Sequence, residues 1–227
     1  MKRLQLPQNL TALAYQQIKQ YILEGRLDEG ARLTEEFVSQ QLGISKSPVR
    51  EAFNRLESEG LIRIEPRRGA FLNTFSVEEI RDLYDLREAL EVHAVRTVRV
   101  TPRLIRELKE SVRRQRTNLE AHNKTRYIEE DIHFHELIAR ETGNSRLVQA
   151  LANLQNQLTI LRRKTYDISS SRAVESHTEL CAALSAGDHD RAQDLMREHI
   201  AITREKLVNH IAARESHPLD ARTSAQM

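Results

Sequence analysis

One aspartate and three histidines have residue types and spacings that suit a metal site. Asp131 and His135 are four residues apart, so on a helix they lie about 40° apart around the axis and share one face. His177 stands ten residues before Gly187, and His199 stands twelve residues after it. If these two segments form an antiparallel helical hairpin that turns at Gly187, the two imidazoles come level and can face each other. One carboxylate with three imidazoles is a suitable ligand set for a divalent transition metal that keeps open coordination positions.

The alternative interpretation is that these four are ordinary side chains. A single histidine is more often a satisfied core or surface residue than a metal ligand. His133 lies two residues from Asp131 and therefore on another face of the same helix. The remaining histidines are also interpreted as ordinary: His93, His122, His189, His210 and His217.

A second group of residues has the chemistry needed to contact DNA. The segment 45–50 reads Ser-Lys-Ser-Pro-Val-Arg and begins a predicted helix. Lys46 and Arg50 are four residues apart, so they share a face, and their long cationic side chains can reach guanine edges and phosphates. Ser45 and Ser47 are small and polar, which lets the start of such a helix enter a major groove. Any one of these residues, taken alone, could also be a solvated surface residue.

The elements predicted around this segment follow the order of a winged helix-turn-helix. Apolar residues at three- and four-residue steps predict helices from residue 10, from the N-cap Thr34, and from Ser45 or Ser47. Glycines at positions 25, 43 and 60 end them. The apolar runs LIRIE and GAFLNTF then predict a β-hairpin, the wing. Its turn contains Arg67, Arg68 and Gly69, which would place two cations near phosphates or the minor groove.

The rest of the chain has the pattern of an all-α bundle. A capping box of Ser76 and Glu79 opens its first helix, and no strand pattern follows. The predicted helices cover about residues 76–100, 101–122, 124–141, 144–166, 172–186 and 188–214, with the serines at 169–171 as a linker or cap. The fold class is therefore mainly α: an N-terminal winged helix-turn-helix over 10–75, a C-terminal all-α helical bundle over 76–214, and a disordered tail over 215–227.

Composition excludes several classes of protein. Glycine and proline together number only 12 of 227 residues, which argues against an all-β sandwich. The single cysteine, Cys181, excludes an intramolecular disulfide and a cysteine-based zinc finger. No apolar run approaches the ~18 residues of a membrane span, and the N-terminal MKRLQLPQNL lacks the apolar core of a signal peptide. We therefore expect a cytoplasmic protein without a membrane partner, associated with the nucleoid when it is bound to DNA.

The segment LGISKSPVREAFNRLESEGLIRIEPRRGAFL resembles the DNA-binding domain of the GntR family of bacterial transcription regulators. In that family the position of Arg50 contacts DNA, and so do the residues just before it and the wing. Two positions depart from the best-known pattern. Lys46 stands where many members have arginine, and Glu36 stands where the fatty-acid-responsive branch has a DNA-contacting arginine, so that contact is not carried over. The resemblance implies DNA contacts at Ser45, Lys46, Ser47, Arg50, Arg67, Arg68 and Gly69.

The segments EEDIHFHELIARETGN, SHTELCAAL and DHDRAQDLMREHI resemble the FCD domain, the ligand-sensing domain of FadR-type GntR regulators, over about residues 77–212. This resemblance favours the metal-binding branch over the metal-free acyl-CoA sensors. We expect zinc, with nickel or manganese as alternatives. The ligands implied are Asp131, His135, His177 and His199.

Arg87, in the motif LYDLREALE, resembles a family position near the ligand cavity. Effectors in the family are often small carboxylates, and an arginine can pair with a carboxylate through two hydrogen bonds. The alternative is a surface arginine that pairs with Glu91, four residues on along the same helix.

These observations predict a ligand-responsive DNA-binding transcription regulator, a repressor that a small carboxylate releases from DNA. We expect a homodimer on a short, nearly palindromic double-stranded operator, because one winged helix covers only a half-site. A metalloenzyme is the alternative from another class, but Glu136 beside His135 points elsewhere and no general base is evident. A purely dimerising helical module would not need the four potential ligands.

Overall fold

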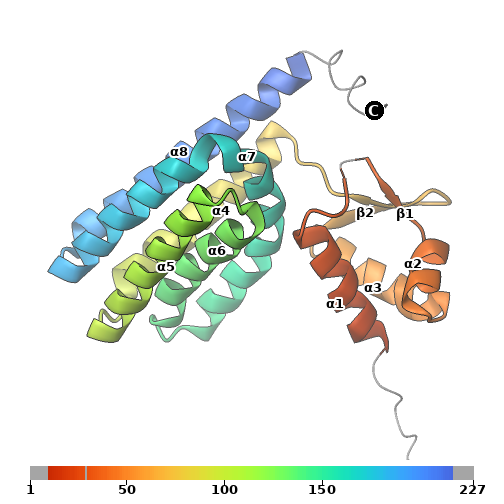
Figure 1. Ribbon diagram of the computed structural model, residues 1–227, viewed down its shortest axis with the longest axis horizontal. Helices are drawn as coiled ribbons and strands as arrows, with labels where there is room; N and C mark the ends of the chain where they lie inside the picture. The colour runs from red at the N-terminus through yellow and green to blue at the C-terminus, as the bar shows by residue number, and fades with distance from the viewer. Residues whose placement is uncertain (1–9, 29, 217–227) are drawn as a thin grey trace, which may run out of the picture. The chain divides into compact units, whose positions relative to one another are not determined.

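The computed structural model describes residues 10–28 and 30–216. The chain divides into two compact units, residues 1–74 and 75–227 (Figure 1). The last helix continues to Ser216, so the first two residues of the predicted tail are helical. Residues 217–227 of that tail lie outside the described part of the chain, as do residues 1–9.

The first unit is a winged helix-turn-helix, as predicted. Three antiparallel strands form a small sheet in the order β1-β3-β2. The sequence pattern missed β1, because two residues are too short for a periodicity to show. The elements of this unit are α1 (Leu10–Leu23), β1 (Arg32–Leu33), α2 (Glu35–Leu42), α3 (Lys46–Ser58), β2 (Ile62–Glu65) and β3 (Gly69–Leu72).

Local chemistry explains why these elements begin and end where they do. The Thr34 hydroxyl accepts a hydrogen bond from the backbone N–H of Phe37 and caps α2. Gly43 ends α2 in the left-handed conformation, at φ 64°. Gly69 has φ 109°, and a Cβ there would lie 2.7 Å from the carbonyl oxygen of Leu33, so only glycine lets β3 approach β1 this closely.

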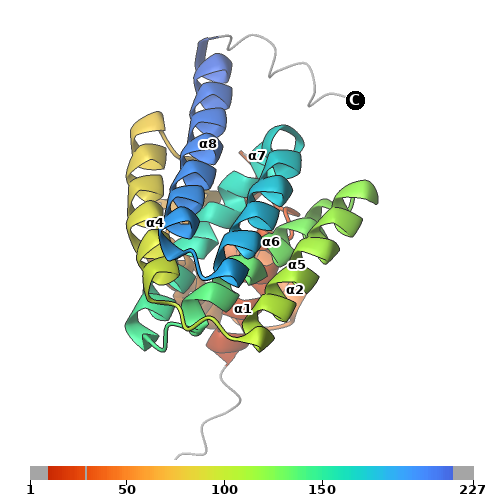
Figure 2. The same cartoon turned by 90° about the vertical axis from the view of Figure 1, so that its left-hand side faces the viewer.

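The second unit consists of five helices among the described residues (Figure 2). The longest, α7, contacts each of the other four. The capping box of Ser76 and Glu79 opens the first helix as predicted. The helices are α4 (Val77–Thr97), α5 (Pro102–Glu120), α6 (Lys124–Arg140), α7 (Ser145–Ala186) and α8 (His189–Ser216).

The predicted break at the serines 169–171 is wrong, because α7 is one continuous helix of 42 residues. It contains no glycine or proline that would interrupt it. Ser169 donates its hydroxyl hydrogen to the carbonyl oxygen of Thr165 at 2.9 Å, and both Ser169 and Ser170 are buried. Tyr127 on α6 donates to the carbonyl oxygen of Ser170 at 3.0 Å. These serines therefore face the bundle interior rather than capping a helix end.

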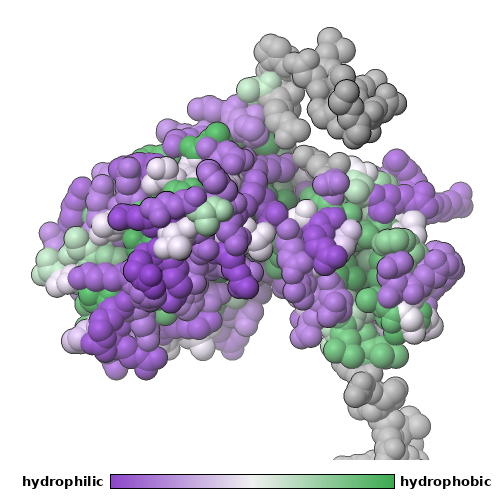
Figure 3. Space-filling view, viewed as in Figure 1, coloured by the Kyte–Doolittle hydropathy of each residue, from purple (hydrophilic) through white to green (hydrophobic). Residues whose placement is uncertain are grey.

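The turn at Gly187 joins α7 and α8 as the predicted helical hairpin, with φ 76° at the glycine. On the face shown in Figure 3, the five-helix unit presents mostly hydrophilic residues. Most of its large apolar side chains are buried, and Leu86 and Ile168 are exposed. No helix among the described residues is both long and apolar enough to cross a membrane.

Candidate metal centre and nucleic-acid interface

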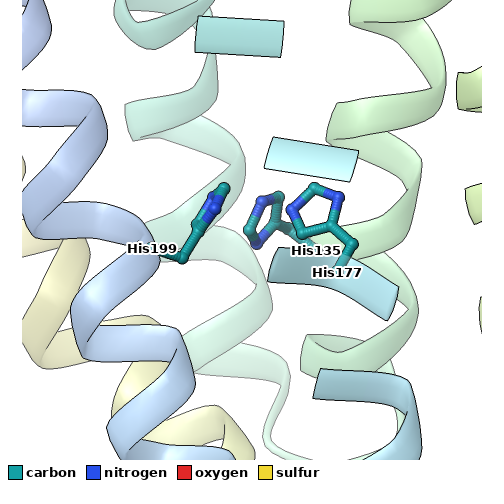
Figure 4. Close-up of side chains that lie close together, drawn as sticks. All are labelled: His135, His177 and His199. Atoms are coloured by element: carbon teal, nitrogen blue, oxygen red, sulfur yellow. The ribbon is translucent and has the colours of Figure 1, made fainter. Parts of the chain in front are cut away.

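Three of the four predicted metal ligands meet inside the helical bundle. His135 projects from α6, His177 from α7 and His199 from α8, and all three are buried. Figure 4 shows the three rings gathered between these helices. One potential ligand atom of each histidine lies within 4.8 Å of the others. The ring centroids are 4.6 Å apart for His177 and His199, and 5.1 Å for His135 and His177.

The fourth predicted ligand, Asp131, adjoins this cluster but already has a cationic partner. Its Oδ1 lies 3.9 Å from Nε2 of His177. Its Oδ2 pairs with Nε of Arg162 at 2.7 Å, and Arg162 is itself buried on α7. The carboxylate therefore stands between the histidines and a buried guanidinium.

Gln115 on α5 orients the ring of His177. Its Oε1 lies 2.8 Å from Nδ1 of His177, and its Nε2 donates to the carbonyl oxygen of Glu130 at 3.3 Å. Because the amide nitrogen is committed to Glu130, the amide oxygen accepts from an Nδ1–H of the imidazole. Nε2 of His177 then carries the lone pair, and it is buried with no hydrogen-bond partner in the described part of the chain. A metal-binding histidine has one nitrogen with a free lone pair while its other nitrogen donates a hydrogen bond. His177 is arranged in this way, and its free nitrogen lies beside a carboxylate.

Arg87 and Glu91 on α4 hold His135 from the other side. Glu91 accepts from Nε of Arg87 at 2.8 Å, and its second oxygen lies against Nδ1 of His135. Arg87 Nη2 lies 3.1 Å from Nε2 of His135. The pairing of Arg87 with Glu91 exists, but the arginine side chain is only 1% exposed. It is therefore a core residue of the candidate site rather than a surface arginine.

The electrostatics favour neutral imidazoles beside charged carboxylates. Burial lowers the pKa of His177 to about 3 and also lowers the pKa of His199. Burial raises the pKa of Asp131, but the positive charges of Arg162 and Arg87 act against it, and the pKa lies below its usual value. Neutral imidazole and ionised carboxylate are the forms that bind a metal.

A narrow pocket of about 20 Å³ adjoins these groups, which is room for about one water molecule. Arg87, Arg162 and His199 line it. Arg162 Nη2 is buried without a hydrogen-bond partner among the described residues, and so is the Tyr166 hydroxyl. The rest of the lining is rich in hydroxyl groups, from Tyr127, Thr165, Tyr166, Ser169, Ser170 and Thr203.

Arg162 is not among the residues predicted from the sequence. A signal was present, because polar residues recur every three or four positions along α7, and these prove to be buried. They form one polar stripe facing the bundle interior: Gln155, Thr159, Arg162, Thr165 and Ser169.

The residues predicted to contact DNA lie on the exposed side of the first unit. At the start of α3, Ser45, Lys46, Ser47 and Arg50 are all exposed, whereas Val49 between them is fully buried. On the wing turn Arg67 and Arg68 are exposed, and Arg67 has a positive φ of 64°. Gly69 follows as the first residue of β3.

Acidic residues pair with the cations of this surface, which the sequence analysis did not foresee. Arg50 makes two hydrogen bonds to Glu35, from Nε and from Nη2, both at 2.7 Å. Lys46 pairs with Glu36. On the wing, Arg68 pairs with Glu65.

A winged helix-turn-helix followed by an all-helical unit with a buried polar cluster points to a class of protein: a DNA-binding regulator with a second, helical domain. Comparison with known families agrees. The model described as bacterial regulatory proteins, gntR family, matches residues 10–72, and that of the FCD domain matches residues 82–202. The chain therefore belongs to the gntR family of bacterial regulatory proteins and carries an FCD domain.

Named relatives extend over most of the chain. The transcriptional repressor RspR of Escherichia coli is 27% identical over 190 residues, which are 82% of this chain and 83% of RspR. A protein of Paenarthrobacter nicotinovorans named "Probable D-xylose utilization operon transcriptional repressor" is 30% identical over 182 residues, 79% of this chain and 80% of that one. A GntR regulator from Rhodococcus shares the fold, with a TM-score of 0.80 and 22% identity over 89% of this chain and 99% of that one.

Proposed function

We propose that this protein is a transcriptional repressor whose FCD domain binds a divalent metal. A small carboxylate that binds the FCD domain would release the repressor from DNA. The proposed metal ligands are His135, His177, His199 and Asp131. The observation that carries this proposal is the unpaired, buried Nε2 of His177, which lies among the other three side chains. When bound, the metal would supply a Lewis-acidic centre to which a carboxylate oxygen can bind.

The chemistry of the donor set supports zinc, with nickel or manganese as alternatives. Three imidazoles and one carboxylate suit zinc, and they leave nickel or manganese room for further oxygen ligands. We assign the centre to sensing rather than to catalysis, because it lies in the FCD domain of a chain that also carries a DNA-binding unit. Glu136, the carboxylate next to His135 in sequence, pairs with Arg140 at 2.6 Å and is not available as a base.

The pocket lining supports the proposed effector class. Arg162 has an unpaired Nη2, and arginine binds carboxylates through charge-assisted hydrogen bonds. Arg87, the effector contact that the family resemblance implies, lines the same pocket. The surrounding hydroxyl groups suit a carboxylate that itself carries hydroxyls, which fits the sugar-related operon named for one relative. The pocket must widen to admit such a molecule. This widening is how effector binding would change the conformation of the rest of the domain.

On the DNA side, we propose that α3 reads the major groove with Ser45, Lys46, Ser47 and Arg50, while the wing contacts the backbone through Arg67, Arg68 and Gly69. One such unit covers a half-site. A homodimer on a nearly palindromic operator would therefore place two copies of α3 on the same face of the duplex.

Metal analysis of the purified protein tests the proposal. We expect about one zinc, nickel or manganese ion per chain in the wild type, and loss of that ion in His135→Ala. The matched control is His133→Ala, which removes a histidine of the same helix that lies two residues from both Asp131 and His135 and therefore on another face. Equal metal content in the two variants would refute the metal site.

A second measurement tests the response to effector. Small carboxylates with and without hydroxyl groups, such as acetate, citrate and gluconate, are screened for a rise in the melting temperature and then for release of DNA. His199→Ala should bind DNA as the wild type does, because His199 lies in the helical unit, and should not respond to the carboxylate. If His199→Ala still releases DNA at the wild-type concentration, sensing occurs elsewhere in the protein.

A further inference from the structure

We propose that Glu35 positions Arg50 for reading a DNA base and is thereby a determinant of sequence specificity. This inference rests on the proposed DNA interface. It concerns a residue that never has to touch DNA itself, and its effect is transmitted through the guanidinium of Arg50.

The pairing leaves the outer edge of the guanidinium available. Glu35 accepts one hydrogen bond from Nε of Arg50 and one from Nη2, so it occupies the side edge of the planar group. Nη1 makes no hydrogen bond to any of the described residues, and Nη2 keeps a second N–H. Two parallel N–H groups at the end of the side chain are the fork that binds O6 and N7 of guanine. Arg50 can therefore contact a base without giving up Glu35.

Glu35 is itself well fixed. It is the first residue of α2, directly after the N-cap Thr34, and α2 packs against α3. The N-terminal end of a helix also favours a negative charge. The Glu35 side chain is 31% exposed, whereas that of Arg50 is 63% exposed. A carboxylate held by one helix thus fixes a flexible cation on the next, which lowers the entropy lost when Arg50 meets a base.

The neighbouring pair of Glu36 and Lys46 lacks these features. Both side chains are more than half exposed, at 56% and 53%. An ammonium group is a point charge on a flexible stem and has no planar fork to orient. Glu36 therefore neutralises Lys46 without positioning it. This makes Glu36 a matched control, since it is adjacent in sequence, carries the same charge and also pairs with a cation of α3.

The two glutamates should respond differently to the same substitution. Removing either carboxylate removes a charge that repels phosphates, so Glu35→Gln and Glu36→Gln should both bind a scrambled duplex more tightly. Only Glu35→Gln should lose discrimination. A glutamine is neutral and has one acceptor oxygen beside an NH2 group that cannot accept, so it loses the two-oxygen pairing with Nε and Nη2. We therefore expect the ratio of specific to non-specific affinity to fall about tenfold.

The test uses the full-length protein and two duplexes of equal length. One is the tightest-binding sequence that the wild type selects from a random library, and the other is its scrambled version. Affinities are measured at several salt concentrations, with circular dichroism as a check on folding. Glu35→Asp is included because it keeps the charge and a good helix start, but is too short to hold Arg50 in the same place.

We expect Glu35→Asp and Glu35→Gln to lower the specificity ratio, Glu36→Gln to leave it unchanged, and Glu35→Gln to have no effect on the ratio when Arg50→Ala is already present. An unchanged ratio in folded Glu35→Gln, or an equal fall in Glu36→Gln, would overturn the positioning role while leaving the DNA interface intact. If the wild type selects no sequence at all, the proposed function fails first, and the inference fails with it.

Discussion

Replacing Gln115 with leucine should weaken metal binding although Gln115 is not a proposed ligand. Its side chain is fully buried on α5 and accepts from Nδ1 of His177 at 2.8 Å. That contact fixes both the tautomer and the orientation of the ring. Leucine has a similar volume, so Gln115→Leu removes the acceptor without opening a large cavity.

The magnitude follows from the two effects of losing this acceptor. Loss of a partner that orients a metal-binding histidine weakens metal affinity about 10- to 100-fold, which is about 1.4–2.7 kcal/mol. A buried Nδ1–H left without an acceptor also destabilises the metal-free fold by about 1–3 kcal/mol. The ring can escape the second penalty by moving its proton to Nε2, but it then presents an N–H where the metal needs a lone pair.

Competition with a chromophoric zinc chelator measures the affinity, and thermal unfolding with and without zinc measures the stability. Ser111→Ala is the control, because Ser111 lies on the same helix and also donates to the carbonyl oxygen of Glu130, at 3.1 Å. It should destabilise the fold by about 1 kcal/mol and leave zinc affinity unchanged. If Gln115→Leu binds zinc as tightly as Ser111→Ala does, then His177 is not oriented through Gln115, and the proposed centre is wrong in that respect.

Three further perturbations have outcomes fixed by the structure. With a chelator present, the free energy of unfolding should fall as the pH is lowered below about 6.5. Burial lowers the pKa values of both His177 and His199, so the unfolded chain binds more protons than the folded one. The loss should reach up to about 1.4 kcal/mol per pH unit for each histidine. A flat melting temperature between pH 7 and 5 would contradict this. Arg50→Ala should lose about 1–3 kcal/mol of operator binding per half-site while its circular dichroism spectrum stays unchanged, and wild-type affinity would exclude Arg50 from the interface. Gly69→Ala should lower the melting temperature of the DNA-binding unit, because a Cβ would lie 2.7 Å from the carbonyl oxygen of Leu33; unchanged melting would show that the wing adjusts freely.

The features that could be predicted from sequence are those that local chemistry decides. Glycines that end helices are recognisable because the left-handed conformation is unfavourable for other residues, and Gly43 and Gly187 both adopt it. The approach of His177 to His199 follows from helix geometry once the turn at Gly187 is recognised. The proximity of Asp131 to His135 is also predictable, because the two residues share one face of α6.

The features that escaped prediction depend on partners distant in sequence. Three serines in a row resemble a linker, and only the contact between Tyr127 and the backbone of Ser170 shows that this segment is packed inside the bundle. Arg87 resembles a surface residue by its spacing to Glu91, and His135, which is 48 residues further along the chain, makes it a core residue. The pairing of Glu35 with Arg50 joins two helices, which no periodicity reveals.

In the proposed function, the interior charges would connect metal binding to carboxylate binding in a way that neither proposed site shows alone. Asp131 is satisfied by Arg162, and Nε2 of His135 is satisfied by Arg87. If Asp131 and His135 turn to a metal, Arg162 loses its carboxylate partner, whereas Arg87 loses only the contact with His135 and keeps Glu91. A buried guanidinium without a counter-ion is strongly unfavourable. A small carboxylate in the adjoining pocket would restore the balance, because both arginines line it. Metal loading should therefore strengthen carboxylate binding, and a protein stripped of metal should bind the same carboxylate weakly even though both arginines are still present.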